Sequence, residues 1–425
     1  MIYVTNPKTV ITETRIALKN LGKINPESID DYIFNGGYQA IAMALEMQPN
    51  AIIDEIEKSG LRGRGGAGFP TGSKNRFTSL SCDDCERFVI CNADEGEPGT
   101  FKDRIIMEND PHLLIEGMLI SAYAVGASIG YIYIRGEYDL SISLLQKAIH
   151  SAYSRGFLGK KIMKSNFSFD LELKIGAGSY LCGEELTLLE SIEGKRGYPR
   201  IKPPFPAEKG LFGKPTLINN VETLSHFPAI ITNGSEWYSN MGTEKTKGTK
   251  IFTLSGNVNN PGFCEVELGI SLYSLIYDFG GGIKDGKSFK GALLGGAAGT
   301  FVDSSMLDAI MGYDKLKERG ATLGSGAIIV FDEDQSVYDL LFSVLRFFQH
   351  ESCGKCIPCR IGTTQILMLM EKLKNEHNKK DILAEILYES EMMAKTSLCP
   401  LGQSPVLPIR SAIMYFENEL IKNNQ

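Results

Sequence analysis

Four cysteines near the C-terminus constrain the fold and chemistry of this chain more than any other feature. Cys353, Cys356 and Cys359 follow a C-x2-C-x2-C spacing, and Cys399 follows in a separate segment. Three closely spaced thiolates and a distant fourth form the ligand pattern of an iron–sulfur cluster. A structural zinc site more often takes two C-x2-C pairs, so this spacing favours iron. The sequence therefore predicts a four-iron, four-sulfur (4Fe-4S) cluster held by these residues.

Composition limits the remaining possibilities. The 425 residues are enough for two to four domains. A net charge of -7 without a basic block gives no electrostatic footprint for nucleic acid. Nine cysteines without a signal peptide fit a reducing, cytoplasmic setting in which thiols bind metals. The uncharged stretch 117–134 contains three glycines and reads as a helix followed by a strand, so we expect no membrane span.

Alternating patterns along the chain predict a multidomain α/β and α+β protein. Short β-rich runs at 88–91, 131–134 and 171–175 alternate with helical patterns, which favours a Rossmann-like parallel sheet covered by helices. The polar stretch 243–250 reads as a linker. We expect four parts: an N-terminal arm and helices (1–60), an α/β domain (61–242), an α+β domain (243–335) and a helical bundle with the cluster (336–425).

The α+β part should contain strands at 250–256 and 327–331 with an amphipathic helix at 271–279 between them. From residue 336 onward the hydrophobic pattern is helical throughout, and the four cysteines lie between the helices.

A glycine-rich segment contains G-x-G-x-x-G at residues 63–68. The dinucleotide fingerprint requires a strand before it, whereas here a helical pattern precedes it and Pro70 follows, so an ordinary Rossmann turn is not expected. The glycines still let backbone N–H groups approach a phosphate or a flat ring, with Arg64 and Lys74 offering charge. A purely structural loop is the alternative.

Three further segments carry polar groups at the ends of predicted elements. Asp94, Glu95 and Glu97 follow a strand, where α/β sheets bind ligands, and they suit ribose hydroxyls, ring N–H groups or a metal. A solvated acidic turn is the alternative. The segment 174–187 reads as strand, glycines and helix start, which favours either an anion site or plain helix-start acids. The segment 214–223 begins another helix with two paired amides.

The other cysteines carry less information. Cys82 and Cys85 form a C-x-x-C whose acidic neighbours would raise the thiol pKa, so we interpret it as structural or incidental. Cys182 and Cys264 stand alone and are expected in the core.

These motifs together resemble the NADH-binding flavoprotein subunit of respiratory complex I, the proton-pumping NADH:quinone oxidoreductase. Related flavin subunits occur in NAD-linked hydrogenases and formate dehydrogenases. The resemblance runs from about residue 50 to the C-terminus and rests on the segments 63–72, 92–99, 176–185 and 219–223 and on the cysteines. One departure is Leu186-Thr187, where the family usually has Thr-Ala. Gly96 also varies in the family.

The resemblance implies an FMN, rather than an FAD, held at the sheet edge. The family positions that contact FMN match Gly63, Arg64, Gly65, Lys74, Asn92, Asp94, Tyr180, Gly183, Glu184, Asn219, Asn220 and Thr223. Those that face NADH match Gly66, Phe69, Phe77, Glu95, Glu97, Glu185, Lys202 and Phe205. No catalytic side chain is implied, because the cofactors carry out hydride transfer while Glu95 and Glu185 serve in positioning. The phenylalanines suit stacking on adenine, and Glu97 suits the adenosine ribose diol.

The implied function is that of an NADH dehydrogenase subunit. Hydride passes from NADH to FMN, and single electrons then pass to the 4Fe-4S cluster and on towards quinone. The α+β part resembles a ubiquitin-like module. The implied partners are a smaller thioredoxin-like subunit with a 2Fe-2S cluster and a larger subunit with several clusters. The implied location is the cytoplasmic face of a membrane-bound complex. Two alternatives stay open: the diaphorase subunit of an NAD-linked hydrogenase or formate dehydrogenase, and a non-enzymatic electron-transfer iron–sulfur protein.

Overall fold

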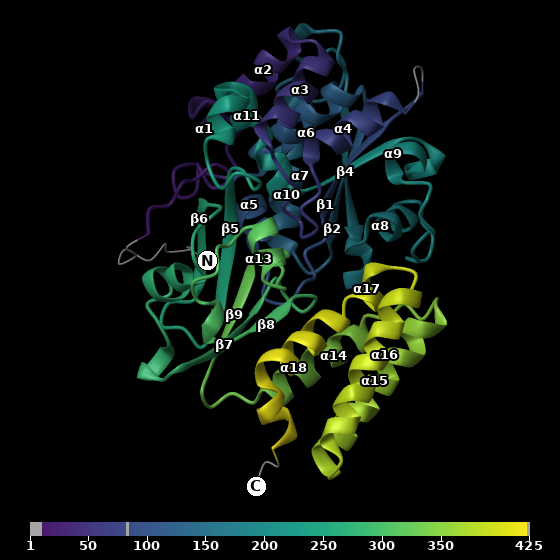
Figure 1. Ribbon diagram of the computed structural model, residues 1–425. Helices are drawn as coiled ribbons and strands as arrows, with labels where there is room; N and C mark the ends of the chain where they lie inside the picture. The colour runs from purple at the N-terminus through teal and green to yellow at the C-terminus, as the bar shows by residue number, and fades with distance from the viewer. Residues whose placement is uncertain (1–10, 82–84, 423–425) are drawn as a thin grey trace.

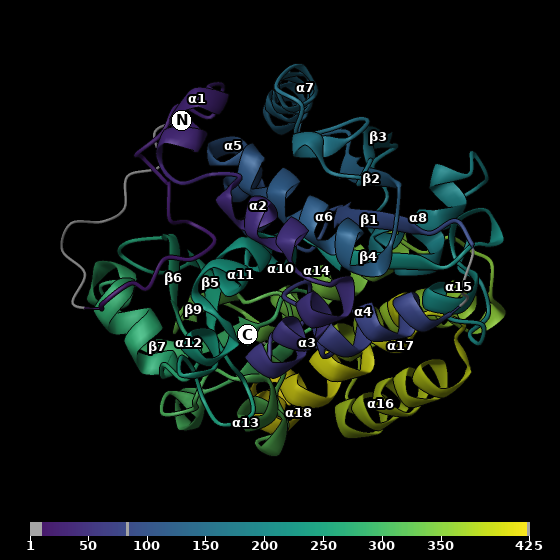
Figure 2. The same ribbon diagram turned by 90° about the horizontal axis from the view of Figure 1, so that it is seen from above.

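The computed structural model describes residues 11–81 and 85–422 (Figure 1). Its first layer is a four-stranded sheet in the order β3-β2-β1-β4, in which all neighbouring strands run parallel. The strands are β1 (Phe88–Ala93), β2 (Ile129–Arg135), β3 (Asp170–Gly176) and β4 (Thr216–Asn220). Figure 2 shows them in this order, with α7 (Asp139–Ser154) on the β3 side. The predicted parallel sheet is confirmed.

Helices cover this sheet, and most of them are short. They are α1 (Ile29–Phe34), α2 (Gln39–Glu46), α3 (Pro49–Ser59), α4 (Thr71–Leu80), α5 (Lys102–Asn109), α6 (Pro111–Val125), α8 (Glu185–Ile192), α9 (Pro206–Lys209), α10 (Val221–Ser225), α11 (Phe227–Asn233) and α12 (Ser235–Ser239). The stretch that lacks charge in the sequence is therefore α6 followed by β2, as predicted.

Helix α6 is the centre of the core because every one of its residues except Tyr123 is buried. The Asp110 side chain caps its first turn by accepting a hydrogen bond from the backbone N–H of Leu113, and Gly126 ends it in the left-handed conformation. A Cβ at Gly117 would lie 2.1 Å from the Leu224 carbonyl oxygen, so only glycine lets α10 approach this closely.

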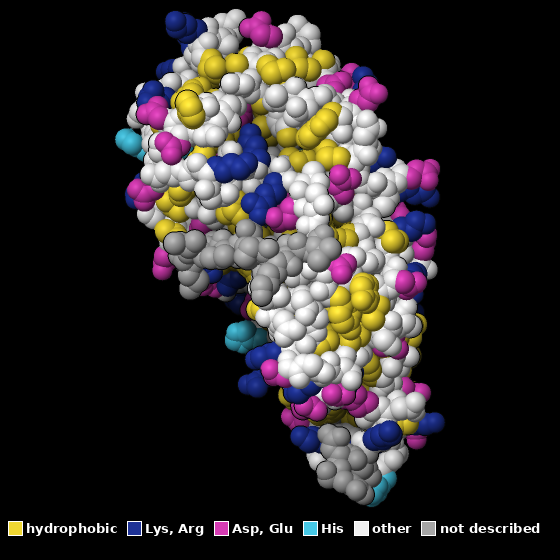
Figure 3. Space-filling view, turned by 90° about the vertical axis from the view of Figure 1, so that its left-hand side faces the viewer, with side chains coloured by type: hydrophobic (Ala, Val, Ile, Leu, Met, Phe, Trp, Pro, Cys, Tyr) yellow, Lys and Arg dark blue, Asp and Glu magenta, His cyan; other side chains and the backbone are white. Residues whose placement is uncertain are grey.

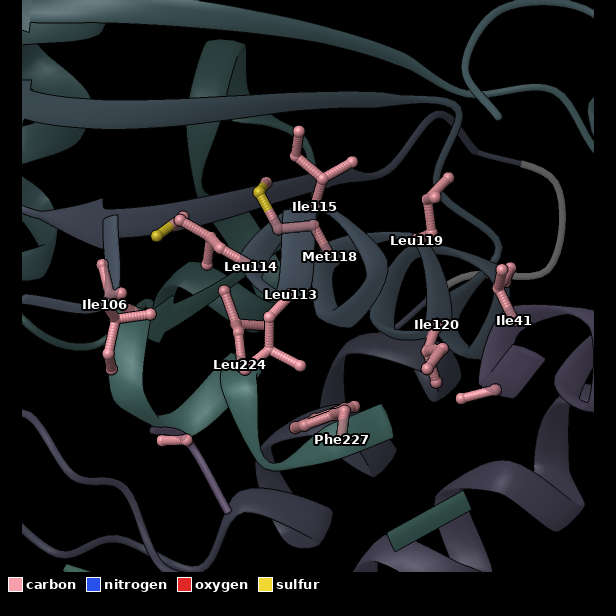
Figure 4. Close-up of a cluster of buried hydrophobic side chains, with 14 of the residues drawn as sticks. Ile41, Ile106, Leu113, Leu114, Ile115, Met118, Leu119, Ile120, Leu224 and Phe227 are labelled. Atoms are coloured by element: carbon pink, nitrogen blue, oxygen red, sulfur yellow. The ribbon is translucent and has the colours of Figure 1, made fainter. Parts of the chain in front are cut away.

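The close-up in Figure 4 shows how α6 fills the core on both sides. Leu113 and Ile120 lie on the side of Leu224 and Phe227, whereas Ile115 and Met118 point towards the sheet. Because all of these side chains are fully buried or nearly so, they anchor the sheet edge that carries the candidate site.

The second layer is a mixed five-stranded sheet in the order β6-β5-β9-β7-β8. Its strands are β5 (Thr249–Gly256), β6 (Gly262–Glu267), β7 (Phe289–Leu294), β8 (Thr300–Val302) and β9 (Ala327–Asp332). β5 and β9 pair in parallel, and the other neighbours are antiparallel. The expected strands are β5 and β9, and α13 (Tyr313–Glu318) is the α-helix of this part.

The amphipathic helix expected over 271–279 is confirmed: residues 272–273 are α-helical and Ser274–Phe279 is π-helical, with Leu275, Ile276 and Phe279 buried. One expectation for this part needs correction. The stretch 243–250 does connect the two sheets, but it is not a solvated linker, because Thr246 and Lys250 are buried. The run of polar residues suggested a linker, but Lys250 is buried because its charge pairs with Glu222 of α10 in the folded protein.

The C-terminal part is the predicted helical bundle. Its helices are α14 (Val337–His350), α15 (Ile357–Asn375), α16 (Lys379–Thr396), α17 (Pro400–Gln403) and α18 (Val406–Ile421). Its core includes Phe301 and Phe331 of the second sheet, so the bundle packs directly on that sheet (Figure 1). β5 begins at Thr249 and α14 at Val337, and the boundaries expected after residues 242 and 335 stay predictions.

Within the described part of the chain, no helix is both long and apolar enough to cross a bilayer. On the face shown in Figure 3, lysine and arginine side chains are interspersed with aspartate and glutamate.

Candidate cofactor-binding site

The carboxyl ends of β1 and β4 bring three of the predicted motifs together. Asn92 of β1 is in register with Asn220 of β4, because the two strands are parallel neighbours. The side-chain amide of Asn92 also donates a hydrogen bond to the carbonyl of Gly183, 2.8 Å away, in the loop before α8. The acidic loop, the third glycine loop and the paired asparagines therefore meet at one sheet edge.

The glycine-rich loop at 63–68 lies against the same edge. The backbone N–H of Arg64 donates to Thr223 Oγ1 at 2.8 Å. A Cβ at Gly65 would lie 3.1 Å from the Cβ of Asn220, so this glycine allows a close approach. Helix α3 precedes the loop and α4 follows it, which confirms that it is not an ordinary Rossmann turn.

The Arg64 side chain does not point into the site. Its guanidinium is fully buried and donates to the carbonyl oxygens of Thr249 (3.0 Å) and Lys247 (2.6 Å) and to the Tyr238 hydroxyl (3.2 Å). The expectation that this side chain offers charge to a ligand is therefore wrong, because β5 and the segment before it supply its partners. The backbone of Arg64 stays at the site.

Two of the three acids after β1 are already engaged. The Glu95 carboxylate accepts hydrogen bonds from the backbone N–H groups of Asp103 (2.9 Å) and Arg104 (3.0 Å), so it caps α5. The Glu97 carboxylate accepts from the Tyr180 hydroxyl and from the backbone N–H of Ala298. Glu95 is turned into the protein, which fits the predicted positioning role and does not support a direct NADH contact.

The third acid and one of the asparagines have unused hydrogen-bonding atoms. Asp94 Oδ2 and Asn219 Nδ2 are buried and have no hydrogen-bond partner among the described residues. A Cβ at Gly183 would lie 3.6 Å from Asp94 Oδ2, so glycine leaves space beside this oxygen. Burial raises the pKa of Asp94 to about 7. Because an unpaired buried polar atom is costly, an acceptor and a donor left open here fit the polar ring edge of a flavin.

The acids at the start of α8 serve partly as a helix cap. Glu184 Oε2 accepts from the backbone N–H groups of Leu186 (3.0 Å) and Thr187 (2.9 Å) and from the Thr187 hydroxyl. Thr187 departs from the usual family residue, and its hydroxyl adds one bond to this cap. The Lys202 ammonium lies 2.9 Å from Glu184 Oε1. Of the two interpretations of this segment, the helix-start acid therefore describes Glu184 correctly, and Glu184 also lies at the candidate site.

Lys74 ties α4 to this helix start. Its ammonium pairs with Glu185 and donates to the carbonyl of Ile218 at 2.8 Å. Three aromatic rings in the neighbouring segments remain open to solvent: Phe69 is 49% exposed, Phe77 57% and Phe205 53%. Phe34 and Phe212, outside the predicted site, are also exposed, so exposure alone does not mark a ligand, but rings of this kind suit stacking on adenine.

Sequence reasoning missed one pair of residues behind the site. The buried Lys102 ammonium lies 3.2 Å from Asn220 Oδ1, and Asn220 Nδ2 donates to Asp103 Oδ2 at 2.6 Å. The two charges fix the orientation of the Asn220 amide. The signal available in the sequence was an adjacent lysine and aspartate at the start of the helical run 102–109.

The four predicted cluster cysteines come together at the junction of α14, α15 and α17. Cys359 and Cys399 are buried in a small core, and Cys353 and Cys356 pack against it. Cys356 is the N-cap residue of α15, and Cys399 is that of α17. All four are free thiols. A Cβ at Gly402 would lie 2.9 Å from the Cβ of Cys359, so the two segments approach closely.

The spacing of the cysteines is that of an iron–sulfur cluster. Among the described residues, no group of three or more His, Cys, Asp or Glu side chains has the geometry of a bound metal ion. A 4Fe-4S cluster spreads its four thiolates over four irons. Burial, reinforced by Cys359 and Cys353, raises the pKa of the Cys399 thiol to about 11, so iron binding must displace a proton there. Cys82 lies outside the described residues, whereas Cys182 and Cys264 are buried, as expected.

Known proteins share both halves of this architecture. Residues 56–229 match the Nuo51 FMN-binding domain, and residues 339–423 match the NADH-ubiquinone oxidoreductase-F iron–sulfur binding region. These matches confirm the predicted cofactors, FMN and an iron–sulfur cluster.

Relatives match over nearly the whole chain. The HndC component of the NADP-reducing hydrogenase of Solidesulfovibrio fructosivorans is 46% identical, with 96% of this chain and 83% of that protein covered. A component of the NADH-quinone oxidoreductase of Aquifex aeolicus is 45% identical, with 96% and 94% covered. A crystal structure of NAD+-reducing nickel–iron hydrogenase has a TM-score of 0.82 at 34% identity, with 97% of this chain and 67% of that chain covered. The chain therefore belongs to the family of FMN- and iron–sulfur-binding flavin subunits of NADH-quinone oxidoreductases and related hydrogenases.

Proposed function

We propose that this chain is the NADH-oxidising flavin subunit of a larger NADH:quinone oxidoreductase, in which electrons leave through the chain's own 4Fe-4S cluster. FMN, when bound, takes two electrons as a hydride and gives them up singly, which suits a place between nicotinamide and a one-electron cluster. The observation that carries the proposal is that the flavin site and the cluster site are neighbours. Tyr180 lies at the flavin site, and the next residue, Leu181, packs in the same small core as Cys359 and Cys399.

The open polar atoms at the sheet edge support the flavin half of the proposal. Asp94 Oδ2 would accept a hydrogen bond from a ring N–H, and Asn219 Nδ2 would donate to a ring carbonyl. The remaining contacts would come from the glycine-rich loop and the neighbouring side chains, namely Gly63, Arg64 (backbone), Gly65, Lys74, Asn92, Tyr180, Gly183, Glu184, Asn220 and Thr223.

The exposed rings and the acids beside them support the nucleotide half. Phe69, Phe77 and Phe205 would stack on adenine, and Glu97 would accept from the adenosine ribose diol while opposing the 2′-phosphate of NADPH. Gly66 would leave space for the nucleotide, and Lys202 and Glu185 would line the entrance. One relative is named as NADP-reducing, so the nucleotide preference needs its own test.

The names of the relatives support a place in an assembly. The relatives in NADH-quinone oxidoreductases are each named as one subunit of that enzyme, so we expect this chain to function with partners. We propose a smaller thioredoxin-like subunit with a 2Fe-2S cluster and a larger subunit with several clusters, at the cytoplasmic face of a membrane.

A second candidate is the diaphorase subunit of an NAD-linked hydrogenase. The 46% identity to a hydrogenase component and the TM-score of 0.82 to a hydrogenase structure favour it specifically. The same site would serve both enzymes, so the partners that copurify with the chain distinguish them: a quinone-reducing membrane complex supports the first, and a subunit with a nickel–iron or iron-only centre supports the second.

An absorption spectrum of the purified protein before and after anaerobic addition of NADH tests the proposal. We expect a flavin band that bleaches with NADH, together with the broad absorption of an iron–sulfur cluster. A preparation that contains flavin and cluster but does not respond to NADH would instead support an electron-transfer protein without dehydrogenase activity.

A further inference from the structure

The last turn of α14 contacts Tyr180 in two ways. The Phe347 ring packs edge-on against the Tyr180 ring, with 4.9 Å between ring centroids and 62° between planes. One turn later, Glu351 Oε2 accepts a hydrogen bond of 3.0 Å from the Tyr180 backbone N–H. Because residues one turn apart share a helix face, a single surface of α14 holds both the ring and the backbone of Tyr180.

Tyr180 in turn fixes the carboxylate of Glu97. Its hydroxyl donates to Glu97 Oε2, while Glu97 Oε1 accepts from the backbone N–H of Ala298 at 2.9 Å. A Cβ at Gly296 would lie 2.3 Å from Glu97 Cγ, so only glycine at this position leaves room for the Glu97 side chain. Glu97 is therefore held between Tyr180 and the segment 296–298.

The same short segment that contains Glu351 also contains three of the cluster cysteines. Only Ser352 separates Glu351 from Cys353. Lys355, between Cys353 and Cys356, donates to the carbonyl of Pro199 at 2.8 Å, just before the loop that contains Lys202. The segment 351–359 therefore contacts both the backbone of Tyr180 and the residues just before Lys202.

We propose that Glu351 is a positioning residue for nucleotide binding, which acts by holding Tyr180 and, through it, Glu97. The proposal rests on the proposed function, because it assigns the role of a residue that the nucleotide itself does not touch. The physical reason is a relay of fixed hydrogen bonds: loss of the Glu351 acceptor frees the Tyr180 backbone, and the Tyr180 hydroxyl then no longer holds Glu97 in one orientation.

The test compares Glu351→Ala and Glu351→Gln with the wild-type holoprotein, with NADH as donor and ferricyanide as a one-electron acceptor. We expect Glu351→Ala to raise the KM for NADH about tenfold, the scale of one hydrogen bond to a charged group, with kcat changed less than about twofold. Glu351→Gln keeps an acceptor oxygen and should restore most of the affinity. An unchanged KM in Glu351→Ala, or a Gln variant as impaired as the Ala variant, overturns the proposal.

A double-mutant cycle tests the route through Tyr180. In a Tyr180→Phe background the hydroxyl link to Glu97 is already absent, so Glu351→Ala should add less than about twofold to KM. A full additional tenfold effect in that background overturns the route. Asp339→Asn, at the other end of α14, is the matched control and should leave KM unchanged.

Iron and FMN content separate positioning from damage to the fold. If Glu351→Ala loses its cluster, Phe347→Leu takes its place. This variant removes the ring contact with Tyr180 and changes no residue of the segment 351–359, although Phe347 also packs against the core of Cys359 and Cys399. We expect a raised KM with the cluster signal retained, and an unchanged KM overturns the proposal. Failure of the proposed function can be told apart from failure of the Glu351 proposal, because the wild-type protein would then not oxidise NADH at all.

Discussion

Asn92 and Gly183 are 91 residues apart in the sequence, yet the Asn92 side-chain amide donates a hydrogen bond of 2.8 Å to the Gly183 carbonyl. This bond joins the end of β1 to the loop before α8. It places the unpartnered Asp94 oxygen beside Gly183, which has no side chain to cover it. The geometry of the proposed flavin site therefore depends on a contact between two separate motifs.

We expect Asn92→Ala to weaken FMN binding about tenfold. The substitution leaves the Gly183 carbonyl without its donor and loosens the loop, and one such bond contributes about 0.5–1.5 kcal/mol before any direct contact of Asn92 with flavin is counted. Fluorescence titration of the apoprotein with FMN measures the affinity. Asn233→Ala is the control, because that amide donates to a helix carbonyl away from the site; equal weakening in both variants would contradict a local role.

Cys399→Ala should abolish the 4Fe-4S signal and remove about four irons per chain. The reason is that Cys399 is the only one of the four predicted ligands that comes from the start of α17, so no neighbouring thiol replaces it. Iron assay and electron paramagnetic resonance of the reduced protein measure the loss. Cys264→Ala, a buried cysteine of the second sheet, should keep its iron. Zinc in place of iron in the wild type would refute the assignment.

Glu97→Gln should narrow the preference for NADH over NADPH. The carboxylate opposes a 2′-phosphate by like charge, and the amide removes this repulsion while it also weakens the contact with the ribose diol. The ratio of kcat/KM for the two nucleotides is the measurement. Glu172→Gln neutralises an exposed acid on β3 and serves as control. The discrimination lies elsewhere if Glu97→Gln leaves the ratio unchanged.

FMN affinity should rise with pH through about 7. Burial raises the pKa of Asp94 to about 7 in the free protein, so this carboxyl is largely protonated below that pH. A ring N–H that donates to Asp94 favours the ionised form, so binding lowers the pKa, and affinity increases as the carboxyl ionises.

Titrations should be repeated with riboflavin. Riboflavin has no phosphate that ionises in this pH range, so any pH dependence of its affinity reports on Asp94. Asp94→Asn should bind flavin with little dependence on pH over the same range. A wild-type affinity that falls as pH rises through about 7 would contradict the assigned hydrogen bond.

Glu222→Gln should destabilise the protein by about 3–5 kcal/mol, because it leaves buried cations without their counter-charge. Burial alone would raise the pKa of Glu222, but Lys250, Lys102 and Arg64 lower it to about 2. The Lys250 ammonium lies 2.6 Å from the Glu222 carboxylate, and both side chains are fully buried.

The shift of the thermal unfolding midpoint measures the effect. Lys315→Met breaks an exposed ion pair with Glu318 and should change stability by less than about 1 kcal/mol. Because the folded pKa of Glu222 is depressed, its contribution is present above the unfolded value and is lost as pH falls towards 2. Equal shifts of the unfolding midpoint in the two variants would show that the buried pair stabilises the protein no more than an exposed pair does.

The sequence by itself determined those helices whose formation depends on residues close together along the chain. The apolar run that forms α6 and the helical periodicity from Val337 onward are local patterns, and both became helices with nearly the expected bounds. The cysteine spacing likewise predicted which thiols gather, because a short loop and one helix start bring them together. Four strands were missed: β4, β6, β7 and β8. The segment 214–223 was interpreted as a helix start, whereas Thr216–Asn220 is a strand because it pairs with the distant β1. β8 (Thr300–Val302) is only three residues long and carries too little pattern.

Only the tertiary structure decided the direction of the charged side chains. Arg64 turned away from the site to the carbonyls beside β5, Glu95 turned to the start of α5, and Lys250 became buried against Glu222. Each of these partners except the α5 backbone lies far away in the sequence. A buried charge takes whichever partner offsets its desolvation, and that partner is set by the packing of distant elements, so no local pattern reveals it.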